Sequence, residues 1–354
     1  MPQPSASPPD PADKMAAAEV SFFSKALAGF AKSNSKFEVV CTISRRHVLP
    51  TPFPASNISP TPTTASSLPS PLVAPSRQRS QIHNLVILDS SFNPPTRAHM
   101  KLATSALVDV RSPLRQPDTP YLSTRLLLLL SVNNADKAPK PASFEQRLTL
   151  MLALARDTHV ELAALDDPAR PLLDVAIDIG LTSEPYFHNK SNAIAVSPFY
   201  ARPSFPSASV DRPTPDQIFL LGYDTVIRIF DPKYYPKTES PTIPEGLPAD
   251  ATPMQIALTP LMRRARLRVT TRPDDQWGDE AAQQAWVADK VDALGGPTEQ
   301  WASKIELGAG DSSTQGVSST VAREASQAGD TEKLSQLVGP EVLARLATLK
   351  PYDA

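Results

Sequence analysis

A short strand, the turn after it and the helix that follows constrain the fold of this chain more than any other stretch. Residues 85–88 (LVIL) form an abrupt, partly β-branched apolar run, which predicts a buried strand. The run ends at Asp89, and a turn cluster that contains two prolines follows it. Apolar residues then recur at helical spacing over residues 97–110, with Thr96 placed to cap the helix. The stretch therefore predicts a strand, a tight loop and a helix.

This loop is a candidate phosphate site. In an open parallel sheet, ligands bind beyond the carboxyl ends of the strands, where helix N-termini present free N–H groups and a partial positive charge. A bare strand-turn-helix unit is more often a plain connection that happens to contain a histidine. The residue types in the loop and elsewhere in the chain have to decide between these two interpretations.

The rest of the chain alternates predicted strands and helices. Apolar runs predict strands at residues 36–43, 126–132, 172–179, 217–221, 266–271 and 304–307. Helical spacing predicts helices at residues 15–31, 144–156, 224–230 and 280–294. The run at 126–132 is apolar on both faces, as parallel strands covered by helices are. We therefore expect an α/β fold, a Rossmann-like open parallel sheet with helices on both faces.

Proline separates the expected ordered and disordered parts. The chain has 39 prolines and only 12 glycines in 354 residues, against an average proline usage of about 5%. Segments rich in Pro, Ser and Thr bury too little to offset the entropy of ordering. We expect a disordered tail at 1–13, a helix and strand that pack on the core at 14–48, a disordered loop at 49–80, and the main domain at 81–354, with a lid or insertion at 185–215.

Charge, cysteine content and hydropathy exclude several classes of protein. The formal net charge of −2 gives no broad basic field for nucleic acid. Cys41 is the only cysteine, which excludes an intramolecular disulfide and a cysteine-based zinc site. The first residues lack the pattern of a signal or transit peptide. No apolar run approaches the roughly 20 residues that span a bilayer. We expect a cytoplasmic or nuclear protein that does not act at a membrane.

The turn and helix also carry a family resemblance. Residues 91–99, SFNPPTxxH, resemble the GxFxPxTxxH signature of the nicotinamide mononucleotide adenylyltransferases, which belong to the nucleotidyltransferase superfamily with its more general HxGH motif. Thr96 stands at the first position of that motif and His99 at the last. Two glycines of the family are replaced, by Ser90 and by Ala98. Ser90 adds a Cβ where the family's backbone approaches a phosphate.

Later segments are similar to the same family in the expected order. Residues 317–323 (VSSTVAR) resemble its ISSTxxR motif, residues 220–224 (LLGYD) its LxGxD segment, and the tail from residue 338 its closing helix. In the first of these, hydroxyls at the start of a helix and Arg323 one turn later converge on one point, as an anion clamp does. Lys137 matches a lysine in the family's loop after the second strand.

Each of these residues also has an ordinary explanation when it is taken alone. A Ser-Ser-Thr run before a helix is a common N-cap cluster. Asp224 could equally be a first-turn carboxylate that favours the helix dipole. Lys137 could equally be a solvated loop residue. The order of the motifs along the chain is what favours the superfamily, in which this chain would be a divergent, fungal-type member.

The resemblance implies an enzyme of pyridine nucleotide biosynthesis. Such an adenylyltransferase joins ATP to nicotinamide or nicotinate mononucleotide and gives NAD, or its deamido form, and pyrophosphate. The acceptor attacks the α-phosphorus in line without a covalent intermediate, so the protein's work is positioning and charge stabilisation. The implied catalytic residues are His99, Thr96 and Arg323, the implied ATP- and phosphate-binding residues are Ser91, Phe92, Lys137, Ser318, Ser319 and Thr320, and the implied nucleotide-binding residues are Gly222 and Asp224.

Magnesium is the implied cofactor, held mainly by substrate phosphates, because no dedicated protein metal site is expected. The implied partners are ATP and a mononucleotide. A homo-oligomer and protein partners on the Pro-rich loops are further options. The choice of acceptor stays open, since the family stacks the nicotinamide ring on tryptophan and residues 165–168 (LDDP) contain no aromatic. A transferase with another acceptor, or a nucleotide-binding or ATP-hydrolysing regulatory protein on the same fold, are the alternatives.

Overall fold

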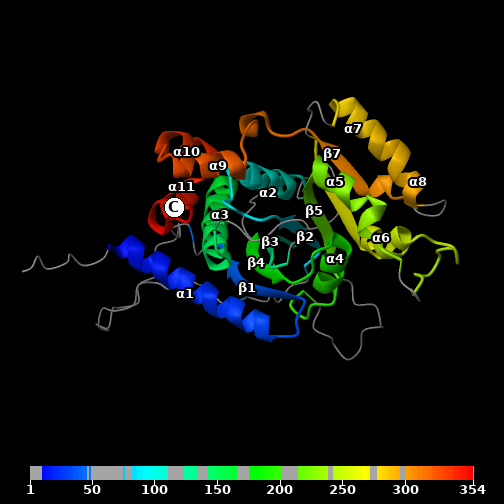
Figure 1. Cartoon of the computed structure of the whole chain (residues 1–354), viewed down its shortest axis with the longest axis horizontal. Helices are drawn as coiled ribbons and strands as arrows, with labels where there is room; N and C mark the ends of the chain where they lie inside the picture. Colours follow the sequence, from blue (N-terminus) through cyan, green and yellow to red (C-terminus); the bar gives the residue numbers. More distant parts are fainter. Residues whose placement is uncertain are drawn as a thin grey trace, which may run out of the picture.

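The structure of the chain is a computed structural model (Figure 1) that describes residues 10–45, 48, 75, 82–110, 123–133, 142–165, 175–200, 214–237, 242–271, 277–295 and 300–353. Almost all of the expected loop at 49–80 lies outside these ranges. Residues 1–9 of the expected tail and 201–213 of the expected insertion also lie outside them.

One sheet of seven strands organises the described residues. The strands are β1 (Phe37–Ile43), β2 (Asn84–Asp89), β3 (Thr124–Ser131), β4 (Ala176–Thr182), β5 (Asp216–Gly222), β6 (Ala265–Thr270) and β7 (Ile305–Gly308). Their order is β1-β4-β3-β2-β5-β6-β7, and all neighbours are parallel except β1 and β4. The six parallel strands therefore have the doubly wound order, which reverses between β2 and β5. The predicted α/β class is confirmed, with β1 as an antiparallel edge.

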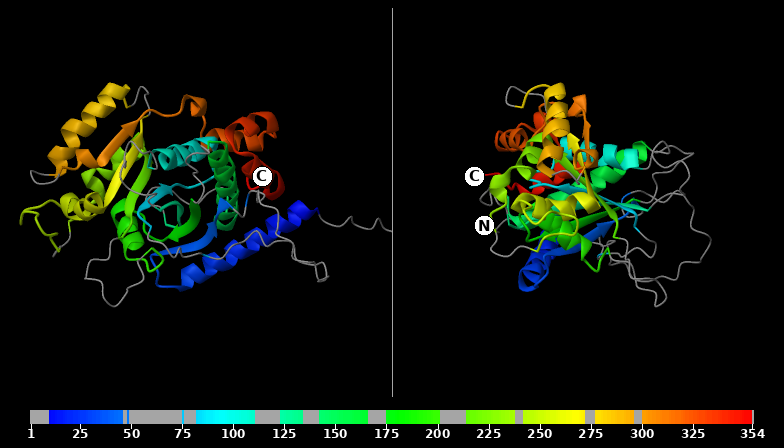
Figure 2. Two further views of the ribbon diagram at one scale, coloured as in Figure 1. Left: turned by 180° about the vertical axis from the view of Figure 1, so that it is seen from behind. Right: turned by 90° about the vertical axis from the view of Figure 1, so that its right-hand side faces the viewer.

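Helices cover both faces of this sheet. One face packs against α2 (Arg97–Val110), α3 (Phe144–Ala164), α9 (Ser319–Gln327), α10 (Thr331–Leu337) and α11 (Pro340–Leu349), with α1 (Pro11–Lys32) beside α3. The other face packs against α4 (Phe187–Ala195), α5 (Tyr223–Ile229), α6 (Pro253–Arg264) and the helical segment that contains α7 (Glu280–Trp286) and α8 (Asp292–Gly295). Figure 2 shows α1 and the α7–α8 segment at opposite ends of the sheet.

The central strands form where the sequence is apolar on both faces. Five consecutive leucines, residues 126–130 of β3, are at most 1% exposed, because helices cover both sides of that strand. β6 alternates instead: Leu267 and Val269 face the packed side, while Arg266 and Arg268 are partly exposed on the other. The sheet is thus fully covered at its centre, where the phosphate-site loop begins.

The first helix starts earlier than the sequence pattern predicted. Residues 11–13, assigned to a disordered tail, are helical, because the Asp10 side chain accepts a hydrogen bond from the Ala12 N–H and proline stands in the first turn. Phe23 and Phe30 of α1 are buried in the core on the α3 side of the sheet. The tail prediction was therefore wrong for these three residues.

The third parallel strand and the segment after it also differ from expectation. β4 spans Ala176–Thr182 rather than residues 172–179. The start of the expected insertion at 185–215 is helix α4, whose Ala193 and Ile194 pack against the sheet. This helix carries the chain from β4 across to β5, so a lid or insertion was the wrong description of residues 187–195. Local composition hid the helix, because the surrounding residues are rich in proline and serine.

Like α4, the helices α6 and α10 had no prediction. The helix predicted at 144–156 extends to Ala164 in α3, and the other predicted strands and helices are confirmed within a few residues of their ends. α6 begins with a capping box in which Thr252 and Gln255 exchange hydrogen bonds. α10 is capped by Asp330. None of the described helices is both long and apolar enough to cross a membrane.

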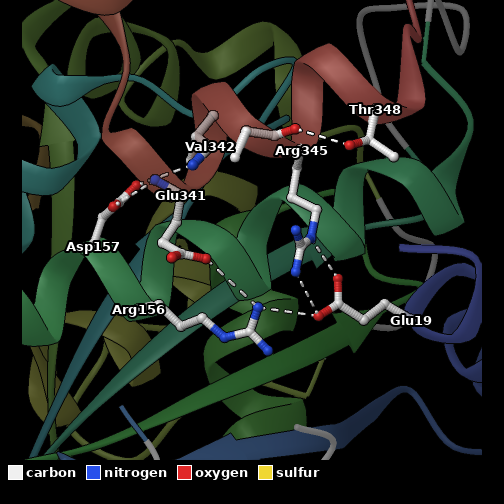
Figure 3. Close-up of polar contacts among 8 residues, drawn as sticks. Glu19, Arg156, Asp157, Glu341, Val342, Arg345 and Thr348 are labelled. Carbon is white, nitrogen blue, oxygen red and sulfur yellow. Dashed lines mark hydrogen bonds and ion pairs between the residues drawn. The ribbon is translucent and has the colours of Figure 1, made fainter. Parts of the chain in front are cut away.

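Buried charged side chains join the N-terminal helix to the C-terminal helix (Figure 3). Glu19 of α1 is fully buried and accepts two hydrogen bonds from Arg345 of α11, at 2.8 and 3.2 Å. Arg156 of α3 lies 3.0 Å from the same carboxylate and 3.8 Å from Glu341. One carboxylate thus holds two guanidinium groups from different helices, and α1 is fastened to the core through charge as well as apolar contact.

A carboxylate on α3 caps α11, as Figure 3 also shows. Asp157 accepts hydrogen bonds from the N–H groups of Glu341 at 3.0 Å and Val342 at 3.2 Å. Its burial raises the pKa of its carboxyl group to about 6, although these two bonds act in the opposite direction. A Cβ on Gly339 would lie 2.1 Å from the carboxylate, so only glycine fits there.

We expect Gly339→Ala to lower the free energy of unfolding by about 2–4 kcal/mol, because Asp157 must move and leave two helix N–H groups unpaired. Thermal and urea unfolding measure this change. Gly29→Ala is the matched control: it lies on the exposed side of α1, nothing would lie within 4 Å of the new Cβ, and it should stabilise by about 0.5–1 kcal/mol. Equal effects of the two substitutions would contradict the close contact with Asp157.

Candidate functional site

The loop of residues 90–96 lies where the doubly wound order reverses. It follows β2, which pairs with β3 on one side and β5 on the other. α2, after β2, covers one face of the sheet, and α5, after β5, covers the opposite face. Between such divergent helices a crevice opens at the carboxyl edge. The loop therefore occupies the position at which this architecture binds ligands.

The imidazole of His99 is held at both ring nitrogens. The N–H of Thr96 donates to Nδ1 at 3.1 Å, and the Thr96 hydroxyl lies 2.9 Å from the same nitrogen. Nε2 lies 3.0 Å from Oγ of Ser90. Desolvation by burial lowers the pKa of His99 to about 4, so the ring is neutral near pH 7. His99 is a neutral, oriented hydrogen-bonding group on the first turn of α2.

The backbone of the loop adopts an uncommon conformation at Phe92. Its φ of 46° lies in the left-handed region, which costs a non-glycine residue about 1–2 kcal/mol. The side chain is fully buried, and its ring centroid lies 5.5 Å from that of His99. Such a conformation persists only where surrounding contacts impose it, and such sites are often functional.

The C-terminal helices supply those contacts. Arg323 of α9 donates from Nη1 to the carbonyl oxygen of Asn93 at 2.6 Å. Ser319, the first residue of α9, donates to the carbonyl oxygen of Pro94 at 2.7 Å. Tyr352, after α11, donates to Oδ1 of Asn93 at 2.9 Å. Three bonds from a distant part of the sequence therefore fix the loop, and they join the two motifs that the sequence separates by more than 200 residues.

The N-terminus of α9 presents its polar groups beside this loop. The Ser318 side chain caps the helix and accepts from the N–H of Val321. Thr320 is exposed, and its Oγ1 accepts from Nη2 of Arg323 at 3.0 Å. The guanidinium group has five N–H donors, and its bonds to Asn93 and Thr320 use two of them. The predicted cluster Ser318, Ser319, Thr320 and Arg323 therefore does assemble next to His99's loop.

The remaining predicted residues fall in different places. Ser91 is exposed at the start of the loop. Gly222 ends β5, and Asp224 forms an ion pair with Arg228 at 2.6 Å within α5. These two residues stand at the carboxyl end of the strand next to β2. Lys137 lies outside the described residues.

Sequence patterns missed a buried ion pair under the loop. Lys190 of α4 lies 2.5 Å from Asp89, the last residue of β2, and both side chains are 6% exposed. Asp89 alone gave no clear signal, because an aspartate is rarely buried unless it is paired. Lys190 could not be identified as the partner of Asp89, because α4, which carries it, was not predicted.

An aromatic cluster surrounds the start of α4. The rings of Tyr186 and His188 are stacked with centroids 5.7 Å apart, and Tyr235 lies 5.4 Å from His188. Tyr234 lies 6.5 Å from Tyr186. Burial lowers the pKa of His188 to about 4, and its Nδ1 is buried without a hydrogen-bond partner among the described residues. All four rings are half-buried; Tyr186 and His188 follow β4, and Tyr234 and Tyr235 follow α5.

The tryptophans lie elsewhere. Trp301 is 1% exposed in the core, with its ring 5.9 Å from that of Phe230. Trp277 and Trp286 both pack edge-on against Tyr223. All three belong to the apolar cluster on the α5–α6 face of the sheet. In the ranges that the structure describes, no three His, Cys, Asp or Glu side chains gather closely enough to hold a metal ion.

Comparisons with known proteins were made for the whole chain. No family model matches it. It is 28% identical over 272 residues to a protein of Schizosaccharomyces pombe that bears the name "Putative nicotinamide mononucleotide adenylyltransferase", and the match covers 76% of this chain and 86% of that protein.

Two solved structures of Plasmodium falciparum nicotinic acid mononucleotide adenylyltransferase are also similar, one complexed with NaAD and one with APC. Their identities are 12% and 10%, and their TM-scores are 0.37 and 0.36. Each comparison covers 76% of this chain and 97% of the other.

Proposed function

We propose that this chain, a homologue of a fungal protein named as a nicotinamide mononucleotide adenylyltransferase, is itself such an enzyme. It joins ATP to nicotinamide or nicotinate mononucleotide and releases pyrophosphate. One observation carries the proposal: Arg323 and Ser319 are hydrogen-bonded to the loop that leads into His99, so that both phosphate-binding motifs face one crevice.

The reaction needs no covalent intermediate on the protein. A phosphate oxygen of the mononucleotide attacks the α-phosphorus of ATP and forms a new P–O bond. The bond from that phosphorus to the β-phosphate bridging oxygen breaks, and pyrophosphate leaves with the electron pair. The residues of the chain then have two tasks. They align the attacking phosphate oxygen, the α-phosphorus and the leaving pyrophosphate, and they stabilise the charge that grows on the pyrophosphate.

His99 supplies an oriented donor for this charge. Its Nδ1 accepts from the N–H of Thr96, which leaves the proton of the neutral ring on Nε2. An Nε2–H at the carboxyl edge can donate to the phosphate oxygens of ATP in the transition state. Thr96 therefore acts by fixing the ring. The main chain at Ser91 and Phe92 meets the substrate phosphates in the same loop.

The start of α9 holds the leaving pyrophosphate. Free N–H groups of the first turn, the hydroxyl groups of Ser318, Ser319 and Thr320 and the remaining donors of Arg323 converge there. Lys137 is assigned to the same phosphates by its place in the family pattern. Gly222 and Asp224, on the neighbouring strand end, are assigned to the nucleotide. Magnesium would arrive with ATP, bound by phosphate oxygens and water.

We assign the binding of the acceptor's pyridine ring to the aromatic cluster of Tyr186, His188 and Tyr234. Tyr186 and His188 follow β4, and Tyr234, from the segment after α5, packs against Tyr186. Lys190, one turn after Tyr186, contacts Asp89 at the start of the loop. An offset stack on a pyridine ring is worth about 0.5–1.5 kcal/mol beyond its buried area. No tryptophan takes this role in the proposal, because the tryptophans pack on the α5–α6 face.

A substrate panel tests the proposal directly. The purified full chain is incubated with ATP, magnesium and, in separate reactions, nicotinamide mononucleotide, nicotinate mononucleotide, and other phosphorylated acceptors. Pyrophosphate release and dinucleotide formation are followed together. We expect both products in equal amounts with a pyridine mononucleotide. Release of inorganic phosphate without a dinucleotide would identify an ATP hydrolase, and transfer only to another acceptor would replace the proposed substrate.

Arg323→Ala is expected to reduce ATP affinity and turnover together, by about 10- to 100-fold in kcat/KM, because a charge-assisted contact to phosphate and the bond to Asn93 are both lost. Arg323→Lys should recover little, since a point charge cannot reproduce the guanidinium fork. Steady-state kinetics measure both variants. Arg266→Ala, a partly exposed arginine of β6 that pairs with Glu306, is the control and should retain activity. Full activity in Arg323→Ala would remove the clamp from the mechanism.

A further inference from the structure

Ser90 is the residue at which this chain departs from the family's glycine, and it is in contact with His99. It directly follows β2, and its own N–H donates to the carbonyl oxygen of Leu129 at 3.3 Å. Its Oγ lies 3.0 Å from Nε2 of His99, and both residues are partly buried. A glycine here would offer the ring no side-chain acceptor.

The direction of this hydrogen bond follows from the other side of the ring. The Thr96 N–H is a backbone amide, so its hydrogen position is set by the peptide plane, and it points at Nδ1. Nδ1 must therefore carry a lone pair. Because the ring is neutral, its proton is on Nε2, and Nε2–H donates to Oγ of Ser90.

This direction excludes an activated serine. In a nucleophilic Ser–His pair, Nε2 must carry the lone pair that takes the serine proton, and Nδ1–H must donate to a carboxylate. Here the first nitrogen is protonated and the second accepts from an amide. Ser90 is therefore an acceptor of the histidine's hydrogen bond.

We propose that Ser90 is a positioning residue: its hydroxyl oxygen occupies the place of a phosphate oxygen and keeps the donating tautomer of His99 aimed at the crevice before ATP arrives. When ATP binds, a phosphate oxygen replaces Oγ as the acceptor. This inference rests on the proposed function of His99, and it assigns to the serine a role that compensates for the loss of the glycine.

Two opposite effects on kinetics follow from this role. Without the hydroxyl, the ring loses its hold at Nε2 and samples other orientations, so kcat falls. The phosphate no longer competes with Oγ, so the KM for ATP stays the same or falls. A neutral hydrogen bond of ordinary strength corresponds to a change of about 3- to 10-fold in kcat. A group that simply bound ATP would raise KM instead.

The test compares Ser90→Ala and Ser90→Gly with wild type, with Ser90→Thr as the variant that retains a hydroxyl. Ser105→Ala, an exposed serine on the same helix as His99 that donates to Leu102, is the matched control. Nitrogen-15 spectra of the imidazoles are recorded without nucleotide, and steady-state kinetics follow. We expect the same tautomer of His99 in every variant, because the Thr96 N–H fixes it. The Nε2–H proton should be protected from exchange with water in wild type, Ser90→Thr and the control, and it should exchange faster in Ser90→Ala and Ser90→Gly, with the kinetic split described above.

The two readouts separate failure of this inference from failure of the proposed function. An Nε2–H proton that is equally protected in Ser90→Ala, or a raised KM at constant kcat, would overturn the positioning role. An inactive wild type with the expected spectral change would overturn the transferase assignment and leave the contact between Ser90 and His99 in place.

Discussion

Replacement of His99 by alanine is expected to lower kcat for dinucleotide formation by on the order of 10²-fold or more, the usual loss when one preorganised donor to a developing charge is removed. The reason is geometric: the Thr96 N–H holds Nδ1 as an acceptor, so Nε2 carries the proton that the proposed function assigns to the phosphate oxygens. Steady-state assays with saturating ATP and mononucleotide measure the change. Binding of ATP should weaken less than turnover, because the bond strengthens as charge moves to the leaving group.

The stability of the same variant decides whether His99 is structural. Its loss leaves the N–H of Thr96 without the ring acceptor, which costs about 1–3 kcal/mol, a shift of a few degrees in melting temperature. His159 is the matched control, since it is 3% exposed on α3 and its Nε2 lies 3.3 Å from the carbonyl oxygen of Ile43, far from the loop in the sequence. His159→Ala should lose stability and keep kcat. The reverse pattern would make His99 a core residue.

The pH dependence gives a second check on His99. Because burial lowers its pKa to about 4, the ring is already neutral at pH 6 and stays neutral above it. The contribution of His99 to kcat should therefore be constant from pH 6 to 8 and should change only as the pH falls through about 4, where a proton on Nδ1 would displace the Thr96 N–H that orients the ring. An activity limb near pH 6.5 that disappears in His99→Asn would show that the ring titrates in water and is not desolvated.

The largest effect on stability is expected for Glu19→Gln, which should lower the free energy of unfolding by about 3–5 kcal/mol. The carboxylate is fully buried and neutralises Arg345 and Arg156 (Figure 3), so its removal leaves two guanidinium groups without their counter-charge inside the protein. Chemical unfolding followed by circular dichroism measures the loss. Glu38→Gln, an exposed position on β1, is the control and should change stability by no more than about 0.5 kcal/mol.

A double substitution separates the charge effect from packing. Arg345→Met in the Glu19→Met background removes a bonded pair together, and apolar replacement of a buried pair is often neutral. The double variant should therefore be more stable than Glu19→Gln. If Glu19→Gln unfolds like wild type, the carboxylate is not the counter-charge of these helices, and α1 would be held by its apolar side alone.

Local patterns in the sequence determined the elements that carry the site. The apolar run at 85–88, the proline turn and the spacing after it are sufficient for a strand, a loop and a helix, because each depends on residues only a few positions apart. The same holds for the cap of α9 at Ser318. Alternation of strands with helices also favoured the parallel sheet, since parallel strands need crossover connections.

The predicted element boundaries were wrong where the amino-acid composition of a segment does not match its structure. α4 lies in a stretch that reads as a Pro/Ser/Ala-rich insertion, and its buried side, Ala193 and Ile194, becomes meaningful only once it packs on the sheet. Its Lys190 and the rings of Tyr186 and His188 were missed for the same reason. The sequence comparison therefore considered only residues 165–168, before β4, for the acceptor ring, whereas the proposed function uses rings that follow β4.

The sequence alone determined which residue types could bind phosphate, because motif chemistry is local. Only the tertiary structure decided what each of them contacts. Arg323 meets the carbonyl oxygen of Asn93 across 230 residues, Tyr352 meets the side chain of the same residue across 259, and Glu19 meets Arg345 across 326. No periodicity encodes such pairs, because they depend on strand order and on which helix covers which face. The role of Ser90 follows the same rule: in the sequence it is a lost glycine, and in the fold it is the partner of His99.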